Sequence, residues 1–245
     1  MGCKSARIGQ TSLSVGAPKI CAPLMGRSPE DFAAEAALAE EAGADLLEIR
    51  LDSADPKKSR AICAAVRAVS PLPRILTYRS RRDGGAGEDD PARYAQILFR
   101  LAEEGACEAL DVELSCGASF ASLCGAARRH GMCVIGSFHD FQATADDARL
   151  QAILREEAEH ADIAKLAVMP RDRFDVVRLC AVALSAAQVL PVPIIAIAMG
   201  ALGMPTRLSP QMAGSCLTFA SAGSPSAPGQ IGVREMKQIL ALQGR

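Results

Sequence analysis

The stretch DIAKLAV at residues 162–168 decides the fold, and it contains a conflict. Its apolar residues predict a buried strand, yet Lys165 stands at its centre. Burial disfavours the charged form of a lysine, so a neutral, nucleophilic amine becomes available near neutral pH. Such an amine can form a Schiff base with a carbonyl substrate. Taken alone, Lys165 is also compatible with a sheet edge or with an amine that extends to water.

Seven other short apolar runs resemble this one, and each run is followed by apolar residues at three- and four-residue spacing. The eight predicted strands are residues 19–24, 45–50, 74–79, 109–114, 133–138, 162–168, 193–199 and 216–221. Strands that alternate with helices are typical of a parallel sheet. Eight units without a linker predict a single (β/α)8 TIM barrel over residues 1–245, which is also a typical length for one.

The segments between the predicted strands support this interpretation. Ser28-Pro29-Glu30-Asp31 is a helix start with a cap and a proline, and Gly43, Gly105 and Gly131 are predicted helix ends. No Gly-x-Gly-x-x-Gly turn follows the first strand, which disfavours an open dinucleotide-binding sheet. Residues 1–17 are polar and irregular, and we expect an N-terminal extension there, either a tail or a lid under the barrel.

The composition favours a small-molecule ligand. Lys and Arg (27) nearly balance Asp and Glu (28), which gives a formal net charge of −1. We therefore expect neither nucleic acid nor a membrane as a partner. Trp is absent and aromatic residues make up 4% of the chain, so there is no aromatic series on which bases could stack.

Cysteine and histidine usage bears on compartment and metals. Nine cysteines is an odd number, and several lie in apolar segments, so we expect free thiols in a reducing compartment. No Cys-x-x-Cys pair exists and there are three histidines, so we expect no metal site. No apolar stretch approaches the ~20 residues that span a bilayer, and residues 1–19 lack the apolar core of a signal peptide. A cytoplasmic location is expected.

Polar side chains gather at the predicted carboxyl ends of the strands, where barrels keep their active sites. The candidates are Glu48, Arg50, Arg79, Asp83, His139, Lys165, Arg207, Ser226 and Gln230. Buried charges need partners, so their convergence implies mutual pairing or a charged ligand. Each also has an ordinary explanation: Glu48 and Arg50 can form an internal ion pair, and a lone histidine is often structural. Arg207, Ser226 and Gln230 are residue types found in any loop or helix start.

Five motifs follow one another along the chain: Glu48-Ile49-Arg50-Leu51-Asp52, Thr77-Tyr78-Arg79 with Asp83-Gly84-Gly85, Ser137-Phe138-His139-Asp140-Phe141, Asp162-Ile163-Ala164-Lys165-Leu166-Ala167, and Ser226-Ala227-Pro228-Gly229-Gln230. In this order they resemble the motifs of type I 3-dehydroquinate dehydratase, the Schiff-base class of this shikimate-pathway enzyme. The resemblance extends from residue 19 to about residue 240. It implies a (β/α)8 barrel, usually a homodimer, that needs no metal or organic cofactor.

The resemblance also implies roles for the candidates. Lys165 is the expected imine-forming residue and His139 the general acid/base. The expected substrate contacts are Glu48, Arg50, Arg79, Arg207, Ser226 and Gln230. Asp83 stands where the family has a glutamate next to the histidine, so its carboxylate is one methylene shorter. We therefore expect dehydration of 3-dehydroquinate to 3-dehydroshikimate, in aromatic biosynthesis or in quinate breakdown.

Two other functions are compatible with parts of the pattern. A lysine-dependent aldolase shares the barrel and the imine, but it does not explain the five ordered motifs. A non-catalytic barrel that binds a metabolite or a partner protein remains possible in principle because fold alone does not determine function. The presence of both Lys165 and His139 argues against it.

Overall fold

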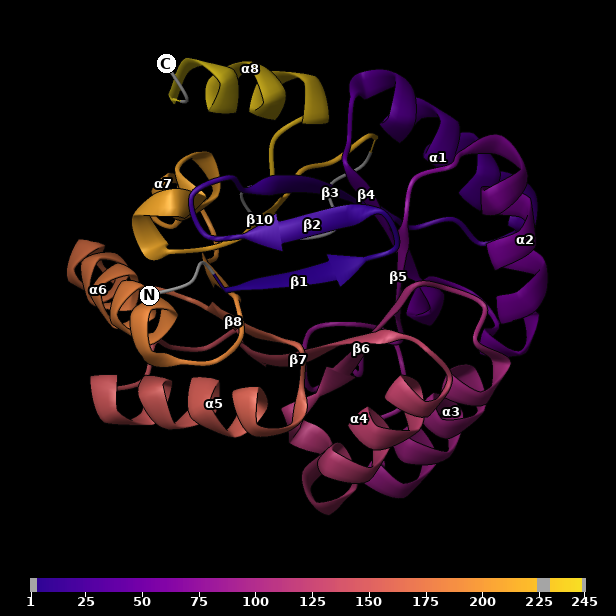
Figure 1. The fold of residues 1–245 in the computed structure, drawn as a ribbon, viewed down its shortest axis with the longest axis horizontal. Helices are drawn as coiled ribbons and strands as arrows, with labels where there is room; N and C mark the ends of the chain where they lie inside the picture. Colours follow the sequence, from indigo (N-terminus) through magenta and orange to yellow (C-terminus); the bar gives the residue numbers. More distant parts are fainter. Residues whose placement is uncertain (1–3, 224–229, 244–245) are drawn as a thin grey trace.

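The computed structural model of the chain describes residues 4–223 and 230–243. In these ranges eight parallel strands form a nearly closed barrel with helices around it, which confirms the predicted (β/α)8 fold (Figure 1). The barrel strands are β3 (Lys19–Leu24), β4 (Leu46–Arg50), β5 (Arg74–Thr77), β6 (Ala109–Glu113), β7 (Cys133–Asp140), β8 (Ile163–Val168), β9 (Ile194–Ala198) and β10 (Leu217–Phe219). The helices are α1 (Pro29–Ala42), α2 (Ser59–Val69), α3 (Pro91–Glu104), α4 (Phe120–Arg129), α5 (Asp147–His160), α6 (Arg173–Val189), α7 (Met204–Leu208) and α8 (Val233–Gln243). Short 3-10 helices add η1 (Leu51–Ser53), η2 (Pro56–Lys58), η3 (Leu114–Ser119) and η4 (Pro210–Ala213).

Each strand pairs with its neighbour in the chain, so the sheet follows the order β10-β3-β4-β5-β6-β7-β8-β9. The ring closes between β9 and β10 through an isolated bridge of Ile194 with Ser215. There the Cys216 N–H donates to the Ile194 carbonyl at 2.9 Å. The predicted strands 74–79 and 216–221 are shorter in the structure, whereas β7 continues two residues beyond its predicted end. Because the barrel strands run parallel, their carboxyl ends lie at the same end of the barrel, which forms its mouth.

Local chemistry explains where α1 begins and ends. The Ser28 hydroxyl accepts the Asp31 N–H at 3.2 Å, and the Asp31 carboxylate accepts the Ser28 N–H at 3.0 Å, which forms a reciprocal capping box. Pro29 occupies the first turn, where its missing N–H is not needed. Gly43 ends the helix at a φ of 94°, a backbone conformation that favours glycine.

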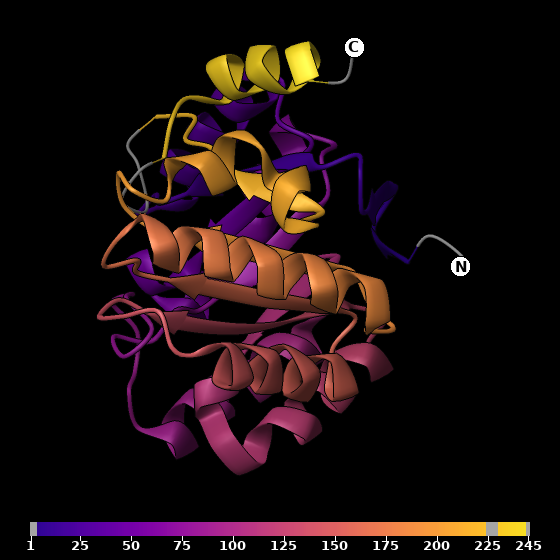
Figure 2. The ribbon, with the colours of Figure 1, turned by 90° about the vertical axis from the view of Figure 1, so that its left-hand side faces the viewer.

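The prediction of an irregular N-terminal segment is wrong. Strands β1 (Ser5–Ile8) and β2 (Thr11–Ser14) form an antiparallel hairpin whose two-residue turn begins with Gly9, at a φ of 56°. Ile8 and Leu13 are fully buried in the apolar cluster inside the barrel. Figure 2 shows the hairpin at the end opposite the carboxyl ends of the strands. Of the two alternatives, the segment is therefore a lid under the barrel.

Candidate active site

The inside of the barrel changes from apolar to polar along the strands. Inward residues recur at every second position, and five of the strands contribute first an apolar and then a polar side chain. The apolar cluster includes Leu46, Ile75, Ala109, Ile135, Ile163, Ile195 and Leu217. Two residues further along five of these strands lie Glu48, Thr77, Asp111, Ser137 and Lys165, all buried. The hairpin closes the apolar end, so the polar groups open towards the mouth.

Lys165 lies among carboxylates instead of standing alone in an apolar strand. Its Nζ donates to Asp111 Oδ2 at 3.0 Å and lies 3.8 Å from Glu48 Oε1. The ammonium also lies over the ring of Phe219, 4.7 Å from its centroid. With 4% of its surface exposed, Lys165 is inside the barrel and does not extend to water. The sequence predicted the burial but not these counter-charges.

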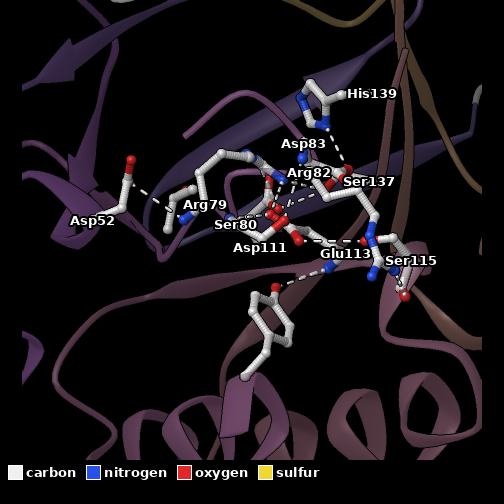
Figure 3. A network of polar contacts seen from close by, with 12 residues as sticks. Asp52, Arg79, Ser80, Arg82, Asp83, Asp111, Glu113, Ser115, Ser137 and His139 are labelled. Atoms are coloured by element: carbon white, nitrogen blue, oxygen red, sulfur yellow. Dashed lines mark hydrogen bonds and ion pairs between the residues drawn. The ribbon is translucent and has the colours of Figure 1, made fainter. Parts of the chain in front are cut away.

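Arg79 occupies the centre of a buried polar network (Figure 3). Its Nη2 lies 2.9 Å from Asp111 Oδ1, and its Nη1 donates to Glu113 Oε1 at 3.1 Å and to Ser137 Oγ at 3.0 Å. The Ser137 hydroxyl in turn donates to Asp111 at 2.6 Å. Burial alone would raise the pKa of Asp111, but Arg79 and Lys165 together hold it below its usual value. Asp111 is therefore ionised at neutral pH.

His139 lies next to Asp83, with 3.3 Å between Nδ1 and Asp83 Oδ2 (Figure 3). Burial, together with the positive charges of Arg79 and Lys165, lowers the pKa of His139 well below 6.5. The imidazole is therefore neutral at physiological pH and can accept a proton. The aspartate is long enough to reach the histidine, which the sequence left in doubt.

The ion pair that the sequence suggested between Glu48 and Arg50 is replaced by other contacts. Arg50 donates from Nε and Nη2 to the two oxygens of Asp52, at 2.9 and 2.8 Å. The short helix η1 turns the chain after Arg50 and returns Asp52 to its side. Glu48 instead accepts the Thr77 hydroxyl at 2.8 Å and faces Lys165.

One cavity at the mouth brings the predicted residues together. Its lining includes Glu48, Arg50, Arg79, Asp83, His139, Lys165, Arg207 and Gln230. Arg207, on α7, is buried, and desolvation lowers its pKa to about 10, so it remains charged at neutral pH. Ser226 lies outside the described residues. Apolar walls come from Phe141, Ala167, Ile197, Met199 and Phe219.

Sequence reasoning missed four members of the polar network: Asp52, Asp111, Glu113 and Ser137. Asp111 and Glu113 carry a usable signal, since they lie two residues apart at the end of a predicted strand, like Glu48 and Arg50. Asp52 and Ser137 belong to motifs that were recognised but received no role of their own. Their contacts depend on the register between neighbouring strands, which the sequence does not reveal.

Comparison with known proteins agrees with this geometry. The family model of Type I 3-dehydroquinase matches residues 20–245. This chain belongs to the type I 3-dehydroquinase family. The suspected resemblance is thereby confirmed, and so is the expected enzyme class, a dehydratase among the lyases. A 3-dehydroquinate dehydratase of Enterococcus faecalis is 34% identical over 249 residues, covering 97% of this chain and 95% of that protein. One of Alkaliphilus oremlandii is 36% identical over 245 residues, covering 97% and 96%.

Solved structures of the family share the whole architecture. The crystal structure of 3-dehydroquinate dehydratase from Geobacillus kaustophilus superposes with a TM-score of 0.92 at 31% identity, covering 98% of this chain and 96% of that one. A type I 3-dehydroquinate dehydratase from Clostridium difficile, solved with covalently modified comenic acid, gives 0.91 at 28% identity, covering 99% and 98%. Similarity over nearly full length includes the hairpin as well as the barrel.

Proposed function

We propose that this protein eliminates water from 3-dehydroquinate to give 3-dehydroshikimate, through a Schiff base on Lys165 and with His139 as general acid/base. Membership of the family supports the reaction, and the shared cavity of a buried amine and a neutral imidazole supports the mechanism. That cavity is the observation that carries the proposal.

The first step is condensation of the substrate ketone with Lys165. Lys165 Nζ gives one proton to the neutral imidazole of His139, which lines the same cavity, and attacks the carbonyl carbon as an amine. The carbonyl oxygen takes up that proton and a second one from the nitrogen and leaves as water, so the nitrogen becomes a positively charged iminium. Asp111 and Glu48 are already fixed 3.0 and 3.8 Å from this nitrogen. Preorganised opposite charge in a buried site stabilises such a cation without further rearrangement.

The next steps move one proton through His139. The iminium withdraws electrons, so the neighbouring carbon loses a proton to the neutral imidazole and an enamine forms. The imidazolium then returns a proton to the departing β-hydroxyl as the enamine collapses. Asp83, 3.3 Å from Nδ1, stabilises the imidazolium between the two transfers. Hydrolysis of the imine releases the product and restores Lys165.

Substrate placement is assigned mainly to Arg207, which binds the carboxylate. A guanidinium presents paired donors that match a carboxylate, and burial makes an anionic ligand favourable there. Gln230 lines the cavity, and it is assigned to the substrate together with Ser226. Glu48, Arg50 and Arg79 complete the pocket, and no metal or organic cofactor takes part in the proposed steps.

Borohydride trapping tests the mechanism. The protein is incubated with 3-dehydroquinate and reduced, and peptide mass spectrometry looks for added mass on Lys165; Lys165→Ala is the control. In parallel, ultraviolet absorbance follows the conjugated enone product. Absence of both signals would contradict the proposal, and trapping of a different ketone with carbon–carbon cleavage would favour an aldolase.

A homodimer in the cytoplasm is part of the proposal. Helix α6 (Arg173–Val189) exposes large apolar side chains on part of its outer side, and a contiguous exposed apolar patch often marks a protein–protein contact. Phe174, Val177 and Leu184 are 79%, 65% and 40% exposed, and they follow helical spacing. The small Ala181 between them allows a second α6 to approach closely.

Among the described residues no helix is long and apolar enough to cross a membrane.

A further inference from the structure

Three carboxyl groups gather behind the ring of His139, around one guanidinium. Asp111 and Glu113 lie 2.9 and 3.1 Å from Arg79, and Asp83 lies against the imidazole (Figure 3). Asp111 also has the charge of Lys165 as a partner. Among the described residues, neither Lys nor Arg forms an ion pair with Asp83. The network therefore holds more acidic groups than its cations can neutralise.

Buried carboxylates without enough counter-charge bind a proton, and neighbouring ones share it. Burial raises the pKa of Glu113 to about 7, with Asp83 adding to the shift and Arg79 opposing it. Burial also raises the pKa of Asp83. Asp111 is the exception because two cations hold it ionised. The pair Asp83 and Glu113 thus takes up a proton as the pH falls through neutrality.

The position of that proton decides what His139 can do. An ionised Asp83 accepts Nδ1–H and leaves the other ring nitrogen, Nε2, as the base. A protonated Asp83 would donate to Nδ1, place the ring proton on Nε2 and prevent base catalysis. Glu113 offers a suitable alternative place. The Ser115 hydroxyl donates to Glu113 Oε2 at 3.4 Å, and this hydrogen bond can reverse when Oε2 carries the proton, because a hydroxyl oxygen also accepts.

We propose that Glu113 is a positioning residue that holds this proton and so leaves Asp83 ionised as the partner of His139 Nδ1. This role rests on the proposed acid/base function of His139. The Glu113 oxygen Oε1 keeps its hydrogen bonds from Arg79 Nη1 and the Ser80 N–H, at 3.1 and 2.9 Å. The proton lies on Oε2 and is donated to Ser115.

Two titratable groups beside Glu113, Tyr94 and Cys116, keep their protons around neutrality. Tyr94, whose hydroxyl oxygen accepts the Glu113 N–H at 3.1 Å, has a pKa raised well above 10 by burial and by Glu113. Burial and Glu113 likewise raise the pKa of Cys116 to about 12. The groups that face Glu113 from the surrounding elements are Arg79, Arg82, Asp83, Glu88, Asp89, Tyr94, Asp111, Cys116, His139 and, through Asp111, Lys165.

Nuclear magnetic resonance of ¹⁵N-histidine-labelled protein without substrate tests the proposal. The chain has three histidines, so single substitutions at His130 and His160 assign the signals. The wild type is expected to show the Nδ1–H tautomer of His139 and a small step in its shift near the pKa of Glu113. Glu113→Gln, which mimics the protonated form, keeps the tautomer and loses the step. Asp83→Asn is expected to move the ring proton to Nε2.

Persistence of the step in Glu113→Gln, or of the Nδ1–H tautomer in Asp83→Asn, would overturn the proposal. The pH profile of kcat is a second readout. The inflection that ionisation of Glu113 produces in this profile near neutral pH is expected to disappear in Glu113→Gln. A purely structural role would instead lower kcat equally at every pH. Because the tautomer is read without substrate, a failure of trapping on Lys165 overturns the proposed function separately.

Infrared spectroscopy covers the case in which Glu113→Gln does not fold. In Glu157→Gln protein, which lacks a second buried glutamic acid whose pKa is raised by burial, a neutral carboxyl band that titrates near neutrality is expected. Labelling glutamate with ¹³C shifts that band if the proton lies on Glu113. A band whose frequency does not change with the label would place the proton on an aspartate and contradict the proposal.

Discussion

Lys165 Nζ and Asp111 Oδ2 lie 3.0 Å apart, with 4% and 1% of the two residues exposed. The strands that carry them are separated by β7, so the pair spans the inside of the barrel across Ser137. A lysine in an apolar strand is therefore tolerated because β6, two strands away in the sheet, supplies its counter-charge. Removal of one partner from a buried pair is costly because the other charge stays buried.

Asp111→Asn is expected to lower the free energy of unfolding by about 3 kcal/mol and to slow borohydride trapping at least ~10-fold. The side chain keeps its size, but Lys165 and Arg79 lose their common carboxylate and the iminium loses its counter-charge. Urea unfolding and the rate of label incorporation measure the two effects. Asp89→Asn, at a half-buried residue that pairs with the exposed Arg81, is the control, with a change below about 1 kcal/mol. If Asp111→Asn kept the wild-type free energy of unfolding and the wild-type rate of label incorporation, the contact between Lys165 and Asp111 would have neither role.

Arg207→Ala is expected to raise KM by about 10- to 100-fold and to change kcat less. Hydrogen bonds to charged groups contribute about 1.5–3 kcal/mol, and this residue is proposed to bind the substrate carboxylate before any chemistry occurs. Steady-state ultraviolet assays measure both constants. The exposed Arg60→Ala controls for loss of positive charge. An unchanged KM in Arg207→Ala would remove this residue from the carboxylate site.

The barrel was predictable because each of its strands is buried on both faces and so forms a continuous apolar run. The site was partly predictable for a related reason: polar residues such as Glu48 and Arg50 interrupt those runs where the strands end. The hairpin was missed because its burial depends on two residues, Ile8 and Leu13, within strands of four residues each. So short a pattern does not separate a strand from an irregular tail.

The sequence predicted which residues form the site better than it predicted which of them pair with one another. Arg50 had two acidic residues at equal spacing along the chain, Glu48 and Asp52, and the η1 turn selects Asp52. Arg79 reaches Asp111 and Glu113 because β5 and β6 are adjacent and their ends lie at similar height. Such choices depend on backbone turns and on inter-strand register, which are properties of the folded chain.

Leu13→Ala is expected to destabilise the protein by about 2–5 kcal/mol while kcat stays at the wild-type value. Leu13 is fully buried under the barrel, at the end away from the cavity. Urea unfolding and the ultraviolet assay test the two parts. Leu38→Ala, at a residue 54% exposed, is the matched control and should change stability by less than about 0.5 kcal/mol. Equal effects of the two substitutions would contradict the role of the hairpin as a closure.

Phe174→Glu is expected to convert the proposed homodimer to a monomer. A charge in the middle of an apolar contact must be desolvated when the second copy binds, which is unfavourable. Light scattering coupled to size exclusion measures the mass in solution. Leu38→Glu places the same charge on α1, at a residue that is also exposed, and should leave the mass unchanged. A dimer that survives Phe174→Glu would exclude the outer face of α6 as the contact.

Glu157→Gln is expected to make stability less dependent on pH. Glu157 is buried on α5, and among the described residues neither carboxyl oxygen makes a hydrogen bond of good geometry. Burial, and to a lesser degree Asp111, raises its pKa well above 4.5 in the folded protein.

Below the unfolded pKa of about 4.3, the carboxyl group of Glu157 is neutral in both the folded and the unfolded state, and its full contribution to stability is present. As pH rises, the unfolded chain ionises first, so stability falls by up to about 1.4 kcal/mol per pH unit until the folded pKa is passed. Glutamine does not titrate, so the advantage of the variant should grow between about pH 5 and about pH 8 in urea unfolding. Glu159→Gln, exposed on the same helix, should follow the wild type. Parallel pH dependence of Glu157→Gln and wild type would mean that this carboxyl group is ionised in the folded protein.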